Sequence, residues 1–212
     1  MLDISNSNFD RFFVVGNLLG SYDKLINILY YQEFSYKDAL VLTGNFIHNE
    51  VNKSIDCFEF IKNNDNCFSV IGRNEVSLLL TDNDNIPVWL KSYPNIDNFK
   101  NFITELPLII KIYDYFFVIN SGIDYSMPLE EQEQEVFYSI GKYDKDSKYY
   151  YNKDTNMSWY DIDYSGTSFC FSNIDAGRIT VPAGYCLYRD VEDPLRCVIY
   201  KRGELYPKII QE

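Results

Sequence analysis

The sequence predicts a layered α/β fold in which buried strands alternate with helices. Three short, continuous apolar runs end at glycines, Gly16, Gly44 and Gly72, and the segments after the first two place apolar residues at helical spacing. Continuous apolar runs are typical of strands that are covered on both faces. Strands and helices that alternate in this way predict a parallel or mixed sheet with helices packed against it.

The first half of the chain supplies these elements in order. The predicted strands are RFFVV, DALVLTGNF and CFSVIG, and the apolar positions of the two helices are Tyr22, Leu25, Ile26 and Leu29, then Ile55, Phe58, Phe60 and Ile61. The segment FKNFITELP predicts another helix, which ends before Pro107 because the residue preceding a proline is disfavoured in helical conformation.

The second half is expected to be rich in strands. LIIKIYDYFFVINSG predicts a hairpin with its turn near Tyr113 and Asp114 and a second strand that ends at Gly122. Residues 141–164, crowded with Tyr, Asp and Lys, show no clean period, and we expect a long loop or an irregular insertion there. Short strands separated by Gly and Pro follow. No linker or repeat divides the chain, so a single domain over 1–212 is predicted.

The composition argues against several classes of function. A net charge of −12 disfavours direct binding to nucleic acid, whose backbone is itself negative. No apolar run approaches the roughly 20 residues of a membrane span, and the N-terminal residues lack the features of a signal peptide. Five cysteines without a CxxC pair fit reduced thiols, and the single histidine, His48, is too few for a His-rich metal centre. We therefore expect a cytoplasmic protein.

Four glycine turns form an ordered series along the chain: VVGNLLG, VLTGNFIHNE, VIGRNE and FVINSGID. Their order and spacing resemble those of the calcineurin-like metallophosphatases, especially the bacterial diadenosine tetraphosphatases and the protein serine/threonine phosphatases. The corresponding family motifs are VVGDxHG, FLGDxxDRG, RGNHE and FVHAGID. The resemblance covers most of residues 10 to 200 and implies a layered sandwich of two mixed sheets flanked by helices.

The resemblance also implies where two metal ions and the catalytic groups of such an enzyme would lie. The matching positions are Asn17, Leu19, Asn45, His48, Asn49, Arg73, Asn74 and Asn120, and Glu75 keeps the family's residue. Neutral amides and a leucine replace aspartate and histidine there, and Arg73 brings a positive charge to a place for cations. We expect no bound metal, no cofactor and no catalytic residue at this degenerate site.

The polar residues of the degenerate site have alternative interpretations. Its asparagines either line a cup for a ligand or preserve tight turns and loop hydrogen bonds, and we favour the second. His48 is expected to be an exposed loop residue rather than a lone general base. Arg73 either binds a phosphate or, as we expect, pairs with Glu75 or another acid.

The predicted function is therefore that of a catalytically inactive protein that binds another protein. Its negative charge suits a partner with a basic surface, such as a component of transcription or replication. The abundant Asn, Ile, Lys and Tyr are expected of an AT-rich genome, which fits a phage-encoded inhibitor or regulator working in the host cytoplasm. The candidate partner-binding residues are Tyr149, Tyr150, Tyr151, Trp159 and Tyr160.

Two alternatives stay open at this point. A residual metal-dependent phosphoesterase or nucleotide hydrolase would need relocated ligands such as Asp23, Glu75, Asp124 or Asp175. A sensor of a nucleotide or another small molecule would instead use the emptied pocket.

The acidic run 130–135 is either a docking surface or a solvated helix face.

Overall fold

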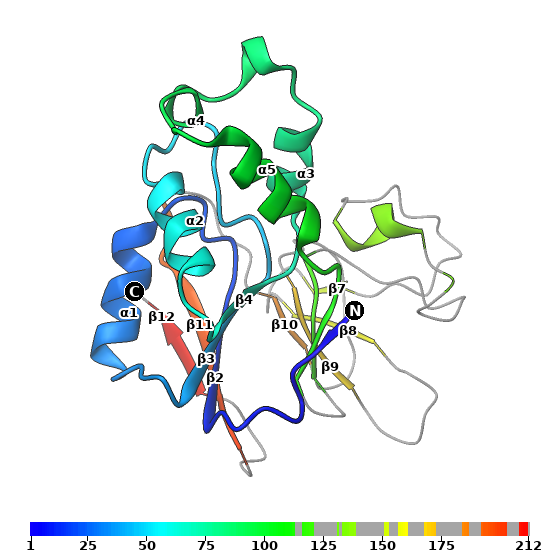
Figure 1. Cartoon of the computed structure of the whole chain (residues 1–212). Coiled ribbons are helices and arrows are strands. Elements are labelled where there is room, and N and C mark those ends of the chain that lie inside the picture. Colours follow the sequence, from blue (N-terminus) through cyan, green and yellow to red (C-terminus); the bar gives the residue numbers. More distant parts are fainter. Residues whose placement is uncertain are drawn as a thin grey trace.

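The computed structural model describes residues 1–112, 116–120, 131, 133–138, 151–152, 157–160, 168–172, 184–186, 192–202 and 208–211. In these residues two β-sheets pack face to face, and helices cover the outer face of one of them (Figure 1). The predicted sandwich of two mixed sheets flanked by helices is confirmed.

The first sheet has the strand order β12-β11-β2-β3-β4. Its strands are β2 (Arg11–Val15), β3 (Asp38–Leu42), β4 (Cys67–Ser69), β11 (Arg196–Lys201) and β12 (Lys208–Gln211). β2, β3 and β4 are parallel, whereas β11 runs antiparallel to its neighbours β2 and β12. The parallel part of this sheet consists of the three strands that the apolar runs predict.

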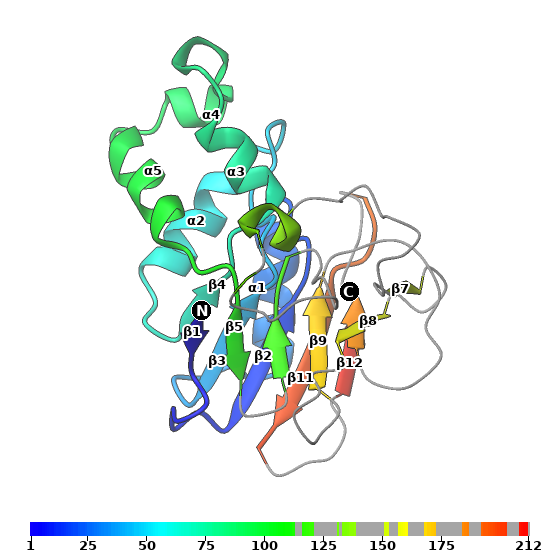
Figure 2. The ribbon, with the colours of Figure 1, turned by 90° about the vertical axis from the view of Figure 1, so that its right-hand side faces the viewer.

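The second sheet has the strand order β1-β5-β6-β9-β8-β7, and β10 also pairs with β9 (Figure 2). Its strands are β1 (Leu2–Asp3), β5 (Ile110–Ile112), β6 (Phe116–Val118), β7 (Tyr151–Asn152), β8 (Met157–Tyr160), β9 (Ser168–Ser172) and β10 (Gly184–Cys186). β5 and β6 are antiparallel, which confirms the predicted hairpin. Its predicted turn at Tyr113 and Asp114 lies outside the described residues.

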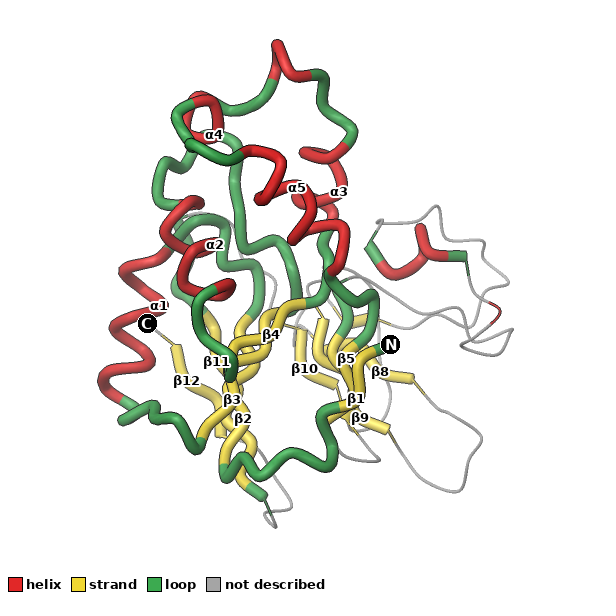
Figure 3. The backbone as a smooth tube through the Cα atoms, in the orientation of Figure 1, coloured by secondary structure: helices red, strands yellow, loops and turns green. Residues whose placement is uncertain are grey.

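The helices divide into two groups. They are α1 (Tyr22–Tyr31) and α2 (Ser54–Lys62), then α3 (Arg73–Leu79), α4 (Val88–Lys91) and α5 (Ile96–Glu105), with 3-10 turns at Asn83–Asn85 and Gln134–Phe137. α1 and α2 cover the first sheet, and α3, α4 and α5 lie beyond its upper end (Figure 3). The predicted end of α5 before Pro107 is confirmed, whereas α4 is an element that the sequence analysis did not predict.

Residues 151–152 and 157–160 are the described part of the segment 141–164, for which a loop or an irregular insertion is expected. These residues form β7 and β8, which pair with each other, and β8 also pairs with β9. Aromatic residues favour strands, and pairing with β9 provides partners for the backbone N–H and C=O groups. β7 and β8 are two and four residues long, too short to show a period in the sequence.

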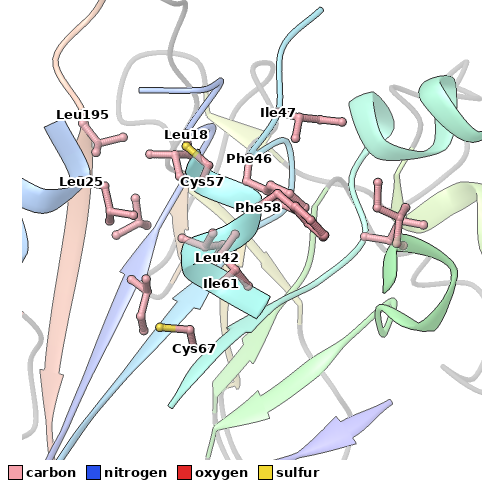
Figure 4. Close-up of a cluster of buried hydrophobic side chains, with 14 of the residues drawn as sticks. Leu18, Leu25, Leu42, Phe46, Ile47, Cys57, Phe58, Ile61, Cys67 and Leu195 are labelled. Atoms are coloured by element: carbon pink, nitrogen blue, oxygen red, sulfur yellow. The ribbon is translucent and has the colours of Figure 1, made fainter. Parts of the chain in front are cut away.

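The apolar residues of β2 alternate between two hydrophobic layers. Phe13 and Val15 belong to the layer under the helices, and Phe12 and Val14 belong to the layer between the sheets. All four side chains are fully buried, which explains why the apolar run is continuous rather than alternating. Figure 4 shows the layer under the helices, where Phe58 of α2 is central.

Phe58 connects this layer to the upper helices. Its ring packs edge-on against Phe99 and Phe102 of α5, with ring centroids 4.7 and 5.3 Å away. A third edge-on contact joins it to Tyr93 at 5.7 Å. The position of α5 therefore depends on this aromatic group, since each such contact adds to the area that the ring buries.

Two further observations concern the chain as a whole. In the part that the structure describes, no helix combines the length and the apolar character needed to cross a bilayer. Cys57, Cys67 and Cys197 are buried and unpaired by disulfides, and burial raises the pKa of the Cys67 thiol to about 12. These thiols therefore stay protonated at neutral pH.

Phe58→Ala is expected to lower the free energy of unfolding by about 3–5 kcal/mol, because it opens a cavity between α2 and α5. Val88→Ala, at a side chain that is 77% exposed, should change it by less than about 0.5 kcal/mol. Urea unfolding followed by circular dichroism measures both changes. Similar effects of the two substitutions would contradict the central role of Phe58.

Candidate functional site

The glycine turns meet at one edge of the first sheet. β2, β3 and β4 are parallel, so their carboxyl ends lie together and the loops that follow them are neighbours. A Cβ atom on Gly44 would lie 2.8 Å from the Cα atom of Gly72, so the two turns are in contact. Gly16 directly follows β2 at the same edge. The three glycines that end the apolar runs therefore lie together at this edge, and Gly122 lies outside the described residues.

Asn17 and Asn45 are hydrogen-bonded to each other across two of these loops. Both have positive φ values, 42° and 52°, which asparagine adopts more readily than most residues. The Nδ2 atom of Asn45 donates to Oδ1 of Asn17 at 2.9 Å. In the same loops the backbone N–H of Leu19 donates to the carbonyl oxygen of Asn45, also at 2.9 Å. The two loops are therefore fixed relative to each other.

Asn74 joins the start of α3 to this pair. Its backbone N–H donates to Oδ1 of Asn45 at 3.1 Å, and its Nδ2 atom donates to the carbonyl oxygen of Ile47 at 2.8 Å. Asn74 thus makes two contacts with the loop that follows β3. Both hydrogen bonds join the first turn of α3 to that loop, so they stabilise the local backbone structure.

Asn120 contributes from the second sheet. It follows β6 and is 3% exposed. Its Nδ2 atom donates to the carbonyl oxygen of Thr43 at 2.7 Å, and its Oδ1 atom accepts the backbone N–H of Arg73 at 3.3 Å. We call Asn17, Asn45, Asn74 and Asn120 the amide network. It connects the loops of the first sheet with the end of β6.

Glu75 is completely buried beside the amide network. Its Oε2 atom accepts the backbone N–H groups of Asn45 and Gly72 at 2.8 and 2.9 Å, and Oε1 accepts that of Ile47 at 3.2 Å. Burial raises the pKa of Glu75 to about 7 and outweighs these donors, which lower it. A Cβ on Gly72 would lie 2.6 Å from Oε2 of Glu75, so the carboxylate requires glycine at this position.

The predicted pairing of Arg73 with Glu75 is wrong. The Glu75 carboxylate accepts the backbone N–H of Gly72, the residue before α3. Arg73 is exposed and makes no ion pair with any carboxylate that the structure describes. The reason is that three backbone N–H groups already surround the Glu75 oxygens.

His48 is half-buried, which corrects the expectation of an exposed residue. Its backbone N–H donates to the Ser54 hydroxyl at 2.9 Å, and that hydroxyl donates back to the His48 carbonyl at 3.0 Å. Nε1 of Trp89 in α4 also donates to this carbonyl, at 3.1 Å. Sequence reasoning missed Ser54 and Trp89, because no local pattern marks a residue 41 positions away as the support of a loop.

The other sequence-predicted residues lie on other elements or outside the described residues. Asp23 lies on α1 and pairs with Lys53. Asp124, Asp175, Tyr149 and Tyr150 lie outside the described residues. Tyr151 belongs to β7, and Trp159 and Tyr160 belong to β8.

The described groups at this edge do not fit the two divalent ions that the resemblance implies. A two-metal centre of this kind relies on carboxylate oxygens and imidazole nitrogens, and a neutral amide oxygen that already accepts an N–H group is a weaker donor. The Oδ1 atoms of Asn17, Asn45 and Asn120 each accept an N–H group, both oxygens of Glu75 do so too, and Leu19 has no donor atom. Among the described residues, no cluster of three His, Cys, Asp or Glu side chains is placed to hold a metal ion.

Glu75→Gln is expected to lower the free energy of unfolding by about 1–3 kcal/mol, because its NH₂ group would face backbone donors. The loss depends on pH. The pKa of Glu75 is about 7 in the folded state and 4.5 when unperturbed, so the folded state binds more protons between these values. Wild-type stability therefore falls as pH rises from about 5 to 7, and its advantage over the non-titrating variant shrinks.

Urea unfolding of both proteins across this pH range measures the difference. Glu50→Gln is the matched control, because Glu50 is exposed in the loop between β3 and α2, and it should change the free energy of unfolding by less than about 0.5 kcal/mol. A wild-type advantage that grows with pH would show instead that the N–H donors outweigh burial at Glu75.

Comparison with known proteins identifies the fold. No protein-family model and no curated protein matches the sequence. Among solved structures, a protein assigned as a diadenosine tetraphosphatase is similar with a TM-score of 0.69 at 18% identity, over 99% of this chain and 96% of that one. A metallophosphoesterase from Sphaerobacter thermophilus is similar with a TM-score of 0.58 at 12% identity, over 95% and 88%. The chain has the fold of the calcineurin-like metallophosphatases.

Proposed function

We propose that this chain is a phosphatase-fold protein without hydrolytic activity that acts by binding another protein. The observation that carries the proposal is the amide network. At the positions that the resemblance assigns to metal ligands, amide oxygens already accept N–H groups. A set of neutral, occupied amides neither lowers the pKa of a water molecule nor neutralises phosphoryl oxygens, which are the tasks of the metal ions in this fold.

The likeness to a protein assigned as a diadenosine tetraphosphatase and to a metallophosphoesterase supports the fold, whereas the activity of this chain must be argued from its site. One fold serves many functions, so the function must be argued from the residues at the site. The loops are still held rigidly by hydrogen bonds, as in Asn17 with Asn45 and in Glu75 with the backbone. A rigid set of loops without catalytic groups is well suited to present a binding surface.

The charge and composition of the chain support a particular kind of partner. A net charge of −12 favours rapid encounter with a protein that has a basic surface, such as a component of transcription or replication. The composition fits a regulator or inhibitor encoded by a phage and acting in the host cytoplasm. The segment 141–164 supplies the aromatic residues that commonly anchor such interfaces.

The purified protein is expected to carry no stoichiometric Mn, Fe or Zn and to hydrolyse neither nitrophenyl phosphate nor dinucleoside tetraphosphates. The reason is that neutral amides, and not carboxylates, stand at Asn17, Asn45 and Asn120 of the amide network, and that the nearby Glu75 oxygens already accept backbone N–H groups. Elemental analysis, nitrophenol release and chromatography of the nucleotide products, the last two with added Mn²⁺, test this. Two metal ions per chain, with turnover that a chelator abolishes, would replace the proposal with the residual phosphoesterase.

A paired substitution serves as the positive control for metal binding. Asn17→Asp/Asn45→Asp would place two carboxylates where amides now lie 2.9 Å apart. Their repulsion should lower the Tm, and Mn²⁺ should raise the Tm of this variant but not that of the wild type, because a cation offsets the repulsion. A wild-type Tm that also rises with Mn²⁺ would count against the proposal.

Replacing Tyr149, Tyr150 and Tyr151 together with Ser is expected to weaken binding of a partner captured from host lysate by about 2 kcal/mol or more, if one of them is a hot spot. Aromatic side chains bury a large area at low cost in side-chain entropy, so their loss outweighs that of single charges at the rim. Titration calorimetry with the purified partner measures the change.

Asn17→Ala/Asn45→Ala is the control for this experiment and should leave partner binding almost unchanged. Circular dichroism and Tm separate loss of binding from loss of fold. The opposite result, with the asparagine pair essential and the tyrosines dispensable, would make the degenerate site the binding surface and favour the small-molecule sensor.

A further inference from the structure

A cavity of about 440 Å³ lies at the opposite end of the first sheet from the degenerate site. It is lined by Asp10, Arg11, Ser35, Lys37, Asp38, Lys201 and Arg202, which we call the strand-start pocket. β2 and β3 begin here, and the antiparallel β11 ends here, at the lower end of the sheet in Figure 1. No residue of the amide network lines it.

The walls of the strand-start pocket are fixed by the sheet. Arg11 pairs in register with Asp38 on one side and with Lys201 on the other, so the three side chains share one face of the sheet. Two backbone hydrogen bonds extend this ladder: Asp10 N–H donates to the Lys37 carbonyl at 2.7 Å, and Arg202 N–H donates to the Asp10 carbonyl at 3.0 Å. The pocket is therefore preformed.

Arg11 is held in the wall of the pocket by its own hydrogen bonds. Its Nε and Nη2 atoms each donate to an oxygen of Asp38 at 2.8 Å, and it also donates to the carbonyls of Gln32 and Glu33. Desolvation raises the pKa of Asp38, but the hydrogen bonds from Arg11 and Ser35 outweigh it and hold that pKa below its ordinary value. The charges of Arg11 and Asp38 thus offset each other.

Basic residues outnumber acidic ones among the described residues that line the pocket. Lys37, Lys201 and Arg202 are exposed there, and Arg202 also donates to the Ser7 carbonyl. The lining carboxylates are Asp10 and Asp38, and the charge of the neighbouring Glu33 also acts on Arg11. The chain as a whole has a net charge of −12, so this is a local reversal of sign. A pocket of this kind attracts carboxylates or phosphates.

Exposed tyrosines lie beside the strand-start pocket. Tyr30, Tyr31 and Tyr36 are 77%, 74% and 82% exposed, and they flank the segment whose Gln32 carbonyl accepts a hydrogen bond from Arg11. The Lys37 ammonium lies 6.0 Å from the centre of the Tyr36 ring. Aromatic rings left open to water next to a charged pocket are typical of protein-binding surfaces, where they supply contact area.

We propose that the strand-start pocket and these tyrosines form a docking site for an acidic segment of a partner protein. Carboxylates of the segment would enter the pocket, and its apolar side chains would cover the tyrosine rings. The charge complementarity is local, and the strongly negative charge of the whole chain disfavours a nucleic acid as the occupant. This site does not rest on the function proposed above, because it shares no residue with the degenerate site.

The test uses a short fluorescein-labelled peptide in which glutamate alternates with leucine, and fluorescence anisotropy. The full chain should bind it roughly tenfold or more tightly than a peptide of equal length with glutamine in place of glutamate, and added salt should reduce the difference. Lys37→Glu/Lys201→Glu should weaken binding of the glutamate peptide roughly tenfold or more. Tyr30→Ser/Tyr36→Ser should weaken it too, with circular dichroism and Tm unchanged.

Lys24→Glu/Lys91→Glu is the matched control, because it changes the charge of the chain equally at residues that do not line the pocket. It should keep most of the wild-type affinity. Equal binding of the glutamine peptide, or equal loss in the control variant, would overturn the proposal. Binding of ATP or single-stranded DNA in preference to the glutamate peptide would overturn it as well.

Discussion

The buried carboxylate of Glu75 is the interaction on which the site's architecture depends. It gathers backbone N–H groups from the loop after β3 and from the start of α3, two segments about 30 residues apart in the chain. Because it accepts these groups where water cannot reach them, the two turns can approach until Gly44 and Gly72 touch. The amide network is laid out on loops that this one side chain holds in place.

The sequence predicts the scaffold well, because the scaffold is built from local signals. The runs that became β2, β3 and β4 are apolar on both faces, and Pro107 marks the end of α5. The positions of the degenerate site follow from the resemblance of the glycine turns to the family motifs. These features depend on residues that are close in sequence.

The sequence does not predict the contacts between residues that are far apart in the chain. Three backbone N–H groups bind the Glu75 carboxylate. Two of them belong to a loop about 30 residues earlier, so the sequence alone favours Arg73, only two residues away, as the partner of Glu75. The support of His48 by Trp89 and the meeting of Arg11, Asp38 and Lys201 arise only when strands pair. β7 and β8 are too short to leave a period, so their pairing with the second sheet is visible only in the fold.

The direction of each amide in the network also governs how this edge of the sheet can change by mutation. Asn45 donates through Nδ2 to an oxygen, and Asn120 donates through Nδ2 to a carbonyl. Aspartate at either position would turn a hydrogen bond into two oxygens facing each other. A single Asn→Asp substitution thus destabilises the fold unless a cation binds. One carboxylate alone does not hold the cation, so several substitutions are needed together. These hydrogen bonds therefore disfavour any return to a carboxylate-lined centre that proceeds through one substitution at a time.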